Sequence, residues 1–173
     1  MEERECYESF PAWIVVLSYL MTVAIYAAGA YALAGLGIVV SVVYLLYCLA
    51  IEIRLLKVGC VDCYYYGKRC GPGRGKLCSL LFKRGDPERF AAKQATWLDM
   101  LPDFLVLIFP LAGGIVSLVL DFSWLRLAAL VVLVALYLGG NAVIRGAFAC
   151  RYCRQGAIGC PALALFGGED ESD

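Results

Sequence analysis

The sequence contains no histidine and few charged side chains, and both shortages limit its chemistry. Without histidine, the chain cannot build a bis-histidine haem site, a histidine-ligated zinc hydrolase, or a Ser-His or Cys-His catalytic pair. Charged residues make up 17% of the chain and hydrophobic residues 62%, whereas an ordinary soluble domain is about a quarter charged. Together with a mean hydropathy of +0.75, this composition excludes a soluble enzyme domain, a DNA-binding module and a disordered tail, and it indicates an integral membrane protein.

Long stretches of the chain carry no charge at all. The run from Ser9 to Ile51 is too long for one membrane helix and suits two, with glycines around Ala34 supplying the break. The runs Phe104–Leu120 and Leu127–Ile144 suit one helix each, because about 20 apolar residues cross a ~30 Å hydrocarbon core. We therefore predict an all-α membrane protein with transmembrane helices at about 12–33, 35–56, 102–120 and 124–148.

The basic residues predict how these helices are oriented. All fifteen Lys and Arg residues except Arg126 lie on the side that carries the N-terminus, the 57–101 loop and the C-terminal tail. Cytoplasmic segments of membrane proteins are enriched in Lys and Arg. We expect a multi-pass protein of the cell membrane with those three segments in the cytoplasm and almost no exterior.

The two halves of the sequence resemble each other. Residues 10–17 (FPAWIVVL) align with residues 101–108 (LPDFLVLI), and the same spacing, Cys-x2-Cys-x6-Cys, follows the second predicted helix of each half. We predict tandem repeats over 1–90 and 91–173, each a helical hairpin followed by a Cys-rich segment, at 57–90 and 149–173. Because each half has two spans, the hairpins should be related by a pseudo-two-fold axis along the membrane normal.

Nine cysteines are the most informative residues in the chain. Four follow the second predicted helix, three follow the fourth, and one in the N-terminal segment lies on the same membrane face. The two predicted sets are Cys60, Cys63, Cys70 and Cys78, and Cys150, Cys153, Cys160 and Cys6. The ninth, Cys48, falls inside a predicted membrane helix, where a free cysteine packs as a small apolar residue.

Cytoplasmic thiols are kept reduced, so clustered Cys-x-x-Cys pairs indicate metal ligands in preference to structural disulfides. Four-thiolate sites favour Zn²⁺ or an iron–sulfur cluster. We predict two structural zinc sites that cap the helix bundle. The alternatives are an iron–sulfur electron-transfer protein, a carrier of metal or thiol cargo, and a thiol–disulfide oxidoreductase.

The remaining polar features suggest contact with the membrane. A basic stretch in the 57–90 segment should contact anionic lipid head groups rather than nucleic acid, and a helix over 86–100 should lie along the interface. Tyr64, Tyr65 and Tyr66 are typical of the interface or of a shield over a metal site. Glu52 and Arg145, near helix ends, should extend to water. A bundle of four helices is compatible with a homodimer or a partner membrane subunit.

Overall fold

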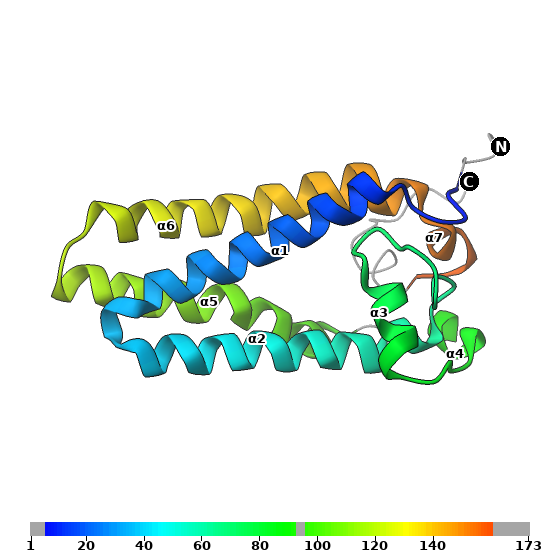
Figure 1. The fold of residues 1–173 in the computed structure, drawn as a ribbon, viewed down its shortest axis with the longest axis horizontal. Helices are drawn as coiled ribbons and strands as arrows, with labels where there is room; N and C mark the ends of the chain where they lie inside the picture. Colours follow the sequence, from blue (N-terminus) through cyan, green and yellow to red (C-terminus); the bar gives the residue numbers. More distant parts are fainter. Residues whose placement is uncertain (1–5, 93–95, 161–173) are drawn as a thin grey trace.

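The computed structural model describes residues 6–92 and 96–160, and four long helices run along its length (Figure 1). They are α1 (Ala12–Leu33), α2 (Ile38–Val58), α5 (Trp97–Leu120) and a fourth helix that begins as α6 (Trp124–Val134) and continues as η3 (Ala135–Gly140) and η4 (Ala142–Ala149). The short elements are η1 (Ala34–Leu36), η2 (Cys60–Asp62), α3 (Arg74–Leu81), α4 (Pro87–Ala92), η5 (Cys150–Tyr152) and α7 (Arg154–Ile158).

The prediction of four membrane-spanning helices is confirmed by their length and composition. With the turns that extend them, the apolar segments are Ala12–Leu36, Ile38–Asp62, Trp97–Leu120 and Trp124–Tyr152, of 24 to 29 residues each. Their outer faces carry large apolar side chains, such as Ile38 at 73% exposure and Val119 at 82%. Such surfaces are stable against lipid and costly in water.

Local capping corrects the predicted start of the third helix. α5 begins at Trp97 because Thr96 and Asp99 form a reciprocal capping box, in which the Thr96 side chain accepts from the backbone amide of Asp99 and the Thr96 amide donates to Asp99 Oδ2 at 3.2 Å. The expected interfacial helix over 86–100 is therefore divided. Residues 87–92 form α4, residues 97–100 belong to α5, and residues 93–95 lie outside the described part of the chain.

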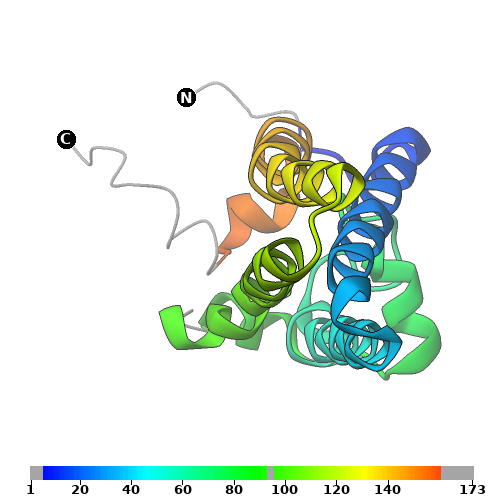
Figure 2. The same ribbon diagram turned by 90° about the vertical axis from the view of Figure 1, so that its left-hand side faces the viewer.

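Small residues let α1 pack against the other three long helices, as the end-on view shows (Figure 2). A Cβ atom at Gly29 would lie 2.5 Å from the hydroxyl of Tyr44, so only glycine fits there. Tyr44 is completely buried and donates to the carbonyl of Val106 on α5 at 3.0 Å. This hydrogen bond satisfies the one polar atom of the largest side chain in the core.

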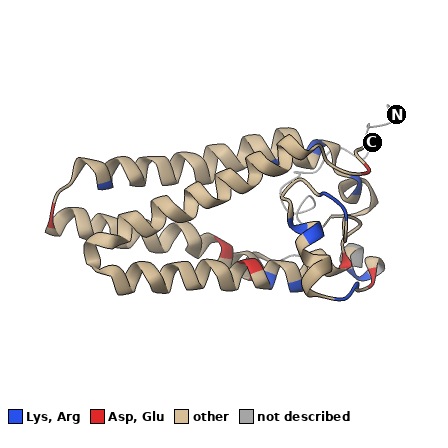
Figure 3. Ribbon diagram, in the orientation of Figure 1, with Lys and Arg blue, Asp and Glu red and all other residues tan. Residues whose placement is uncertain are grey.

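The two ends of the bundle differ in charge (Figure 3). At one end, Arg126 donates to the backbone carbonyl of Asp121 at 2.6 Å and to its carboxylate at 2.7 Å, and it also reaches Ser117. It thereby satisfies the carbonyl of Asp121, the residue that caps the end of α5. Most other charged residues gather toward the opposite end, together with the cysteine-bearing turns.

Candidate functional site

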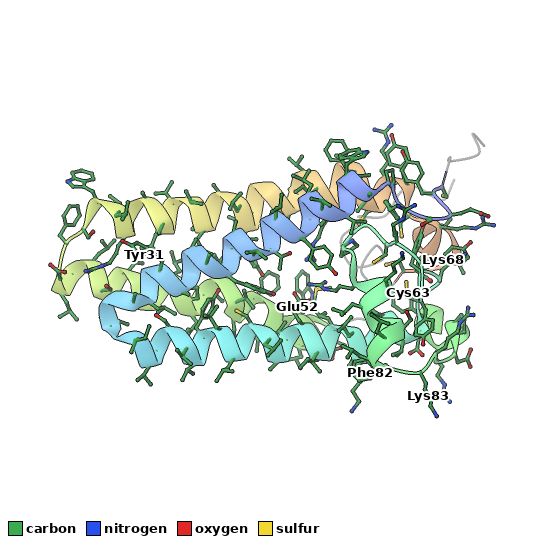
Figure 4. All side chains as sticks on the ribbon, in the orientation of Figure 1. Tyr31, Glu52, Cys63, Lys68, Phe82 and Lys83 are labelled. Carbon is green, nitrogen blue, oxygen red and sulfur yellow. The ribbon has the colours of Figure 1, made fainter. Side chains whose placement is uncertain are left out.

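The first Cys-x-x-Cys pair forms a tight turn directly after α2. The turn η2 covers Cys60–Asp62, and the amide of Cys63 donates to the carbonyl of Cys60 at 3.4 Å. The amide of Tyr66 then donates to the carbonyl of Cys63 at 3.0 Å. Two successive hydrogen bonds thus hold both cysteines in one compact turn at the end of the bundle, where Cys63 lies close to α3 (Figure 4).

The second Cys-x-x-Cys pair adopts the same local structure after the fourth helix. The amide of Cys153 donates to the carbonyl of Cys150 at 3.2 Å, and the amide of Gly156 donates to the carbonyl of Cys153 at 3.0 Å. The backbone angles agree as well. Gly59 has φ −109° and ψ −52°, and its equivalent Ala149 has φ −100° and ψ −59°. The same spacing has produced the same turn at both positions.

The two turns bind each other through equivalent residues. The amide of Tyr64 donates to the side-chain oxygen of Gln155 at 2.7 Å, and the amide of Arg154 donates to the hydroxyl of Tyr65 at 3.0 Å. Tyr64 and Arg154 each follow the second cysteine of their turn, and Tyr65 and Gln155 come next. In each turn, the first residue after the cysteine pair therefore contacts the second residue after the pair of the other turn, as at a two-fold interface.

The N-terminal segment lies beside the second turn. Tyr7 forms an isolated bridge with Cys153, and its amide donates to the carbonyl of Tyr152 at 3.0 Å. The hydroxyl of Tyr65 donates to the carbonyl of Tyr7. This arrangement brings Cys6, the residue before Tyr7, to the end of the molecule that carries both turns.

The sulfur atoms combine burial with backbone donors. Burial raises the pKa of the Cys63 thiol to about 11, while an N–H donor from Tyr65 acts in the opposite direction. Burial likewise raises the pKa of Cys153, against N–H donors from Gly156 and Gln155. The donors from Tyr65 and Gln155 are equivalent, each two residues after its cysteine. N–H groups aimed at sulfur stabilise the thiolate that a metal requires.

The third cysteine of the first set has a similar environment. The amide of Gly75 donates to Cys70 Sγ at 3.2 Å. Burial raises the pKa of Cys70, whereas that amide and the neighbouring Arg74 lower it. The Cys78 thiol is completely buried and donates to the carbonyl of Leu56 at 3.6 Å, and burial, followed by the nearby Cys70, raises its pKa.

The segment between Cys70 and Cys78 is held against α1 and α2 by hydrogen bonds to Tyr19 and Glu52. Gly73 has φ +80°, and the hydroxyl of Tyr19 donates to its carbonyl at 3.1 Å. Arg74, the first residue of α3, holds both carboxylate oxygens of Glu52 at 2.6 Å. Glu52 therefore does not extend to water as expected, but points into the bundle (Figure 4).

The thiols lie in neighbouring turns, but the structure does not gather them into metal-binding groups. Within residues 6–92 and 96–160, no three cysteine, aspartate or glutamate side chains are close enough to hold one ion. Cys150 is exposed, Cys6, Cys60, Cys63, Cys153 and Cys160 are half-buried, and Cys70 and Cys78 are buried. Cys48 packs in the core of the bundle with Tyr44, as expected from its place in α2.

Two features of this end were not expected from the sequence. Tyr65 is only 2% exposed and joins the two turns, instead of lying at the membrane interface. Gln155, also buried, is its counterpart. The sequence does show that Tyr65 and Gln155 are equivalent, because each stands two residues after the second cysteine of its turn.

Comparisons with protein-family models, curated proteins and solved structures gave no match for this chain.

Proposed function

We propose that this multi-pass membrane protein binds two zinc ions at a thiol-rich cytoplasmic cap, and that the metal holds the cap together. Cys60, Cys63, Cys70 and Cys78 would form one site, and Cys6, Cys150, Cys153 and Cys160 the other. Zinc prefers four thiolates in a closed tetrahedral site when its role is structural.

One observation carries the proposal. Two Cys-x-x-Cys pairs far apart in sequence fold into the same hydrogen-bonded turn, and the two turns bind each other through equivalent residues. A turn that served only to end a helix would not need to recur with the same cysteine spacing. In the first set, the amide of Gly75 also donates to Cys70 Sγ at 3.2 Å, and donors of this kind offset the negative charge of bound thiolates in the second shell of a metal site.

The surroundings favour a structural role over a catalytic one. The first turn is linked to α2 and α3, and the second to the fourth helix and to the N-terminal segment through Tyr7. Drawing the thiols around two ions would tie together segments that belong to different helices. Because metal binding requires deprotonated thiols, it would release protons and add its binding energy to folding.

The proposed side of the membrane follows from charge. Basic residues gather at the end of the bundle that carries the thiol turns (Figure 3), whereas Arg126 lies in the first turn of α6, beside the α5–α6 connection at the other end. With the positive end in the reducing cytoplasm, the thiols would remain available for metal.

The test is thermal unfolding of protein purified anaerobically in detergent, before and after removal of metal with a strong chelator. We expect a colourless protein whose unfolding temperature falls when zinc is removed and returns when zinc is added. Cys63→Ser should abolish most of that response, whereas Cys48→Ala, a cysteine in the bundle core, should retain it.

The other outcomes would reject structural zinc. A brown protein with iron and acid-labile sulfide would indicate electron transfer. Zinc that exchanges freely without changing the unfolding temperature would indicate a carrier. Defined cysteine pairs without metal would indicate thiol–disulfide exchange.

A further inference from the structure

The cytoplasmic half of the fourth helix carries a polar stripe within an otherwise apolar span. Tyr137, Asn141 and Arg145 follow one another at four-residue intervals, so they lie along one side of the helix. The side-chain amide of Asn141 donates to the carbonyl of Tyr137 at 2.7 Å. The hydroxyl of Tyr137 donates to the backbone carbonyl of Asp103 on α5 at 2.9 Å.

The helix is also widened over this stripe. Both η3 and η4, which together carry all but Asn141 of the stripe, are wound as π-helix. π-Helical turns are rare and are found frequently at functional sites. The wide turns coincide with the polar residues and leave the apolar half of the same helix, Trp124–Val134, as ordinary α-helix.

Three polar groups of this region have no partner among the residues that the structure describes. The side-chain oxygen of Asn141 is buried and accepts no hydrogen bond. Neither the guanidinium of Arg145 nor the carboxylate of Asp103 takes part in a hydrogen bond or ion pair there. A buried acceptor without a partner is costly, and polar residues within a membrane span frequently mark functional sites, so the buried oxygen of Asn141, together with these two charged side chains, indicates a site that receives a ligand.

The neighbouring charges do not satisfy Arg145. The groups that act on it electrostatically are Arg74, Glu52, Tyr137 and Asp103, and Arg74 is the strongest of them. Glu52 is already held at both oxygens by Arg74. Glu52 is thereby occupied, and no described residue gives Arg145 a hydrogen-bonded anionic partner, so an anionic group of a ligand can bind there.

The site is accessible from the side of the bundle. Toward the end of the bundle that carries Arg126, α5 and α6 pack closely, because a Cβ at Gly114 would lie 2.7 Å from Leu130. Toward the cytoplasmic end, α5 and the η3 part of the fourth helix are joined by the long side chain of Tyr137. Arg145 itself is exposed, and a Cβ at Gly146 would meet nothing within 4 Å. Arg145 lies seven residues before Tyr152, or about 10 Å from the end of the span, which is the depth of lipid head groups.

We propose that the stripe is a binding site for a phospholipid head group that carries both a phosphate and a primary ammonium group. The phosphate would bind Arg145 through charge-assisted hydrogen bonds, and the ammonium would donate to Asp103 and to the oxygen of Asn141. A purely anionic head group would face the unpaired carboxylate of Asp103. A choline head group has no N–H to donate. The site is independent of the proposed zinc.

Native mass spectrometry of the full chain can test this, with phosphatidylethanolamine, phosphatidylcholine and phosphatidylglycerol of the same acyl chains added to the detergent. We expect phosphatidylethanolamine to bind about tenfold more tightly than phosphatidylcholine, and Arg145→Gln to weaken it by about the same factor. Arg151→Gln, an exposed arginine near the same end of the fourth helix, should bind like the wild-type protein.

A second variant separates ligand binding from a folding defect. Asp103→Asn should bind phosphatidylglycerol as well as it binds phosphatidylethanolamine, because the ammonium partner is removed and the phosphate partner remains. Equal binding of all three lipids by the wild-type protein, unchanged lipid preference in both variants, or soluble phosphoethanolamine that competes as strongly as the lipid would overturn the proposal.

Discussion

The two Cys-x-x-Cys turns have the same backbone but very different surroundings. After the first, the chain forms α3 and returns, so that Cys70 and Cys78 are buried. After the second, the described chain adds only the five-residue helix α7, and Cys150 is exposed. The spacing of the cysteines therefore determines the turn, whereas the chain that follows determines how deeply the cysteines are buried.

The difference also defines which turn depends on the other. The first is anchored by the Glu52–Arg74 ion pair and by Tyr19, neither of which has a described counterpart at the second. The second turn is held by hydrogen bonds to the first, in which Arg154 donates to Tyr65 and Gln155 accepts from Tyr64. The segment around Tyr7 also holds it. Damage to the first turn should therefore spread to the second more than the reverse.

The largest expected effect comes from removing the anchor of the first turn. Glu52→Gln leaves Arg74, whose side chain is 13% exposed, without its partner, and we expect a loss of about 3 kcal/mol of unfolding free energy. Unfolding in detergent measures it. Asp121→Asn, which removes an ion-pair partner that is 76% exposed, should cost under about 1 kcal/mol. Equal losses in the two variants would show that the Glu52–Arg74 pair is not an anchor.

A second effect tests the loop that carries Cys70 toward α1. Gly73→Ala would place a Cβ 2.3 Å from the ring of Tyr19 at a φ of +80°, and we expect a cost of about 2 kcal/mol. Gly146→Ala, where nothing lies within 4 Å, is the matched control and should be neutral or slightly stabilising. Unfolding temperatures of the two variants that agree would contradict this view of the loop.

A third effect tests the contact between the turns. Tyr65→Phe removes hydrogen bonds to Tyr7 and Arg154, and Gln155→Leu removes the acceptor for Tyr64. Each should cost about 1–2 kcal/mol, because buried backbone groups lose their partners. The double variant should lose less than the sum, since both changes open one interface. Strict additivity in a double-mutant cycle would mean that the two bonds act separately.

The smallest effect is expected at Cys48, which lies in the core among apolar side chains. Cys48→Ala should cost about 1 kcal/mol for the small cavity that it leaves. Its zinc content should equal that of the wild-type protein in an elemental analysis. A lower content would place Cys48 among the ligands and undo the distinction between core and cap thiols.

Much of the fold was predictable because hydropathy and turn residues are local signals. The break near Ala34 is found where the glycines indicate it, with Gly37 at φ +120°. The prediction of a helix from 102 is too late, because a proline is typical of a first helical turn, whereas the capping box of Thr96 and Asp99 starts α5 at Trp97. The tandem symmetry and the cytoplasmic side stay predictions.

The site was predictable only where spacing alone determines structure. The identical Cys-x-x-Cys spacing is accompanied by the same local turn at both positions. It could not indicate that Glu52 pairs with Arg74, because that contact depends on how α3 packs against α2. For the same reason, the burial of Tyr65 depends on the opposite turn, which lies about ninety residues away in the sequence.

Zinc content tests the proposed metal-bound cap most directly, measured on three anaerobically purified proteins: the wild type, Cys63→Ser and Cys153→Ser. We expect about two ions per chain in the wild type. We expect about one after Cys153→Ser, and one or fewer after Cys63→Ser, because the second turn depends on contacts with the first. A wild-type protein without bound metal, or variants that retain both ions, would contradict the proposal.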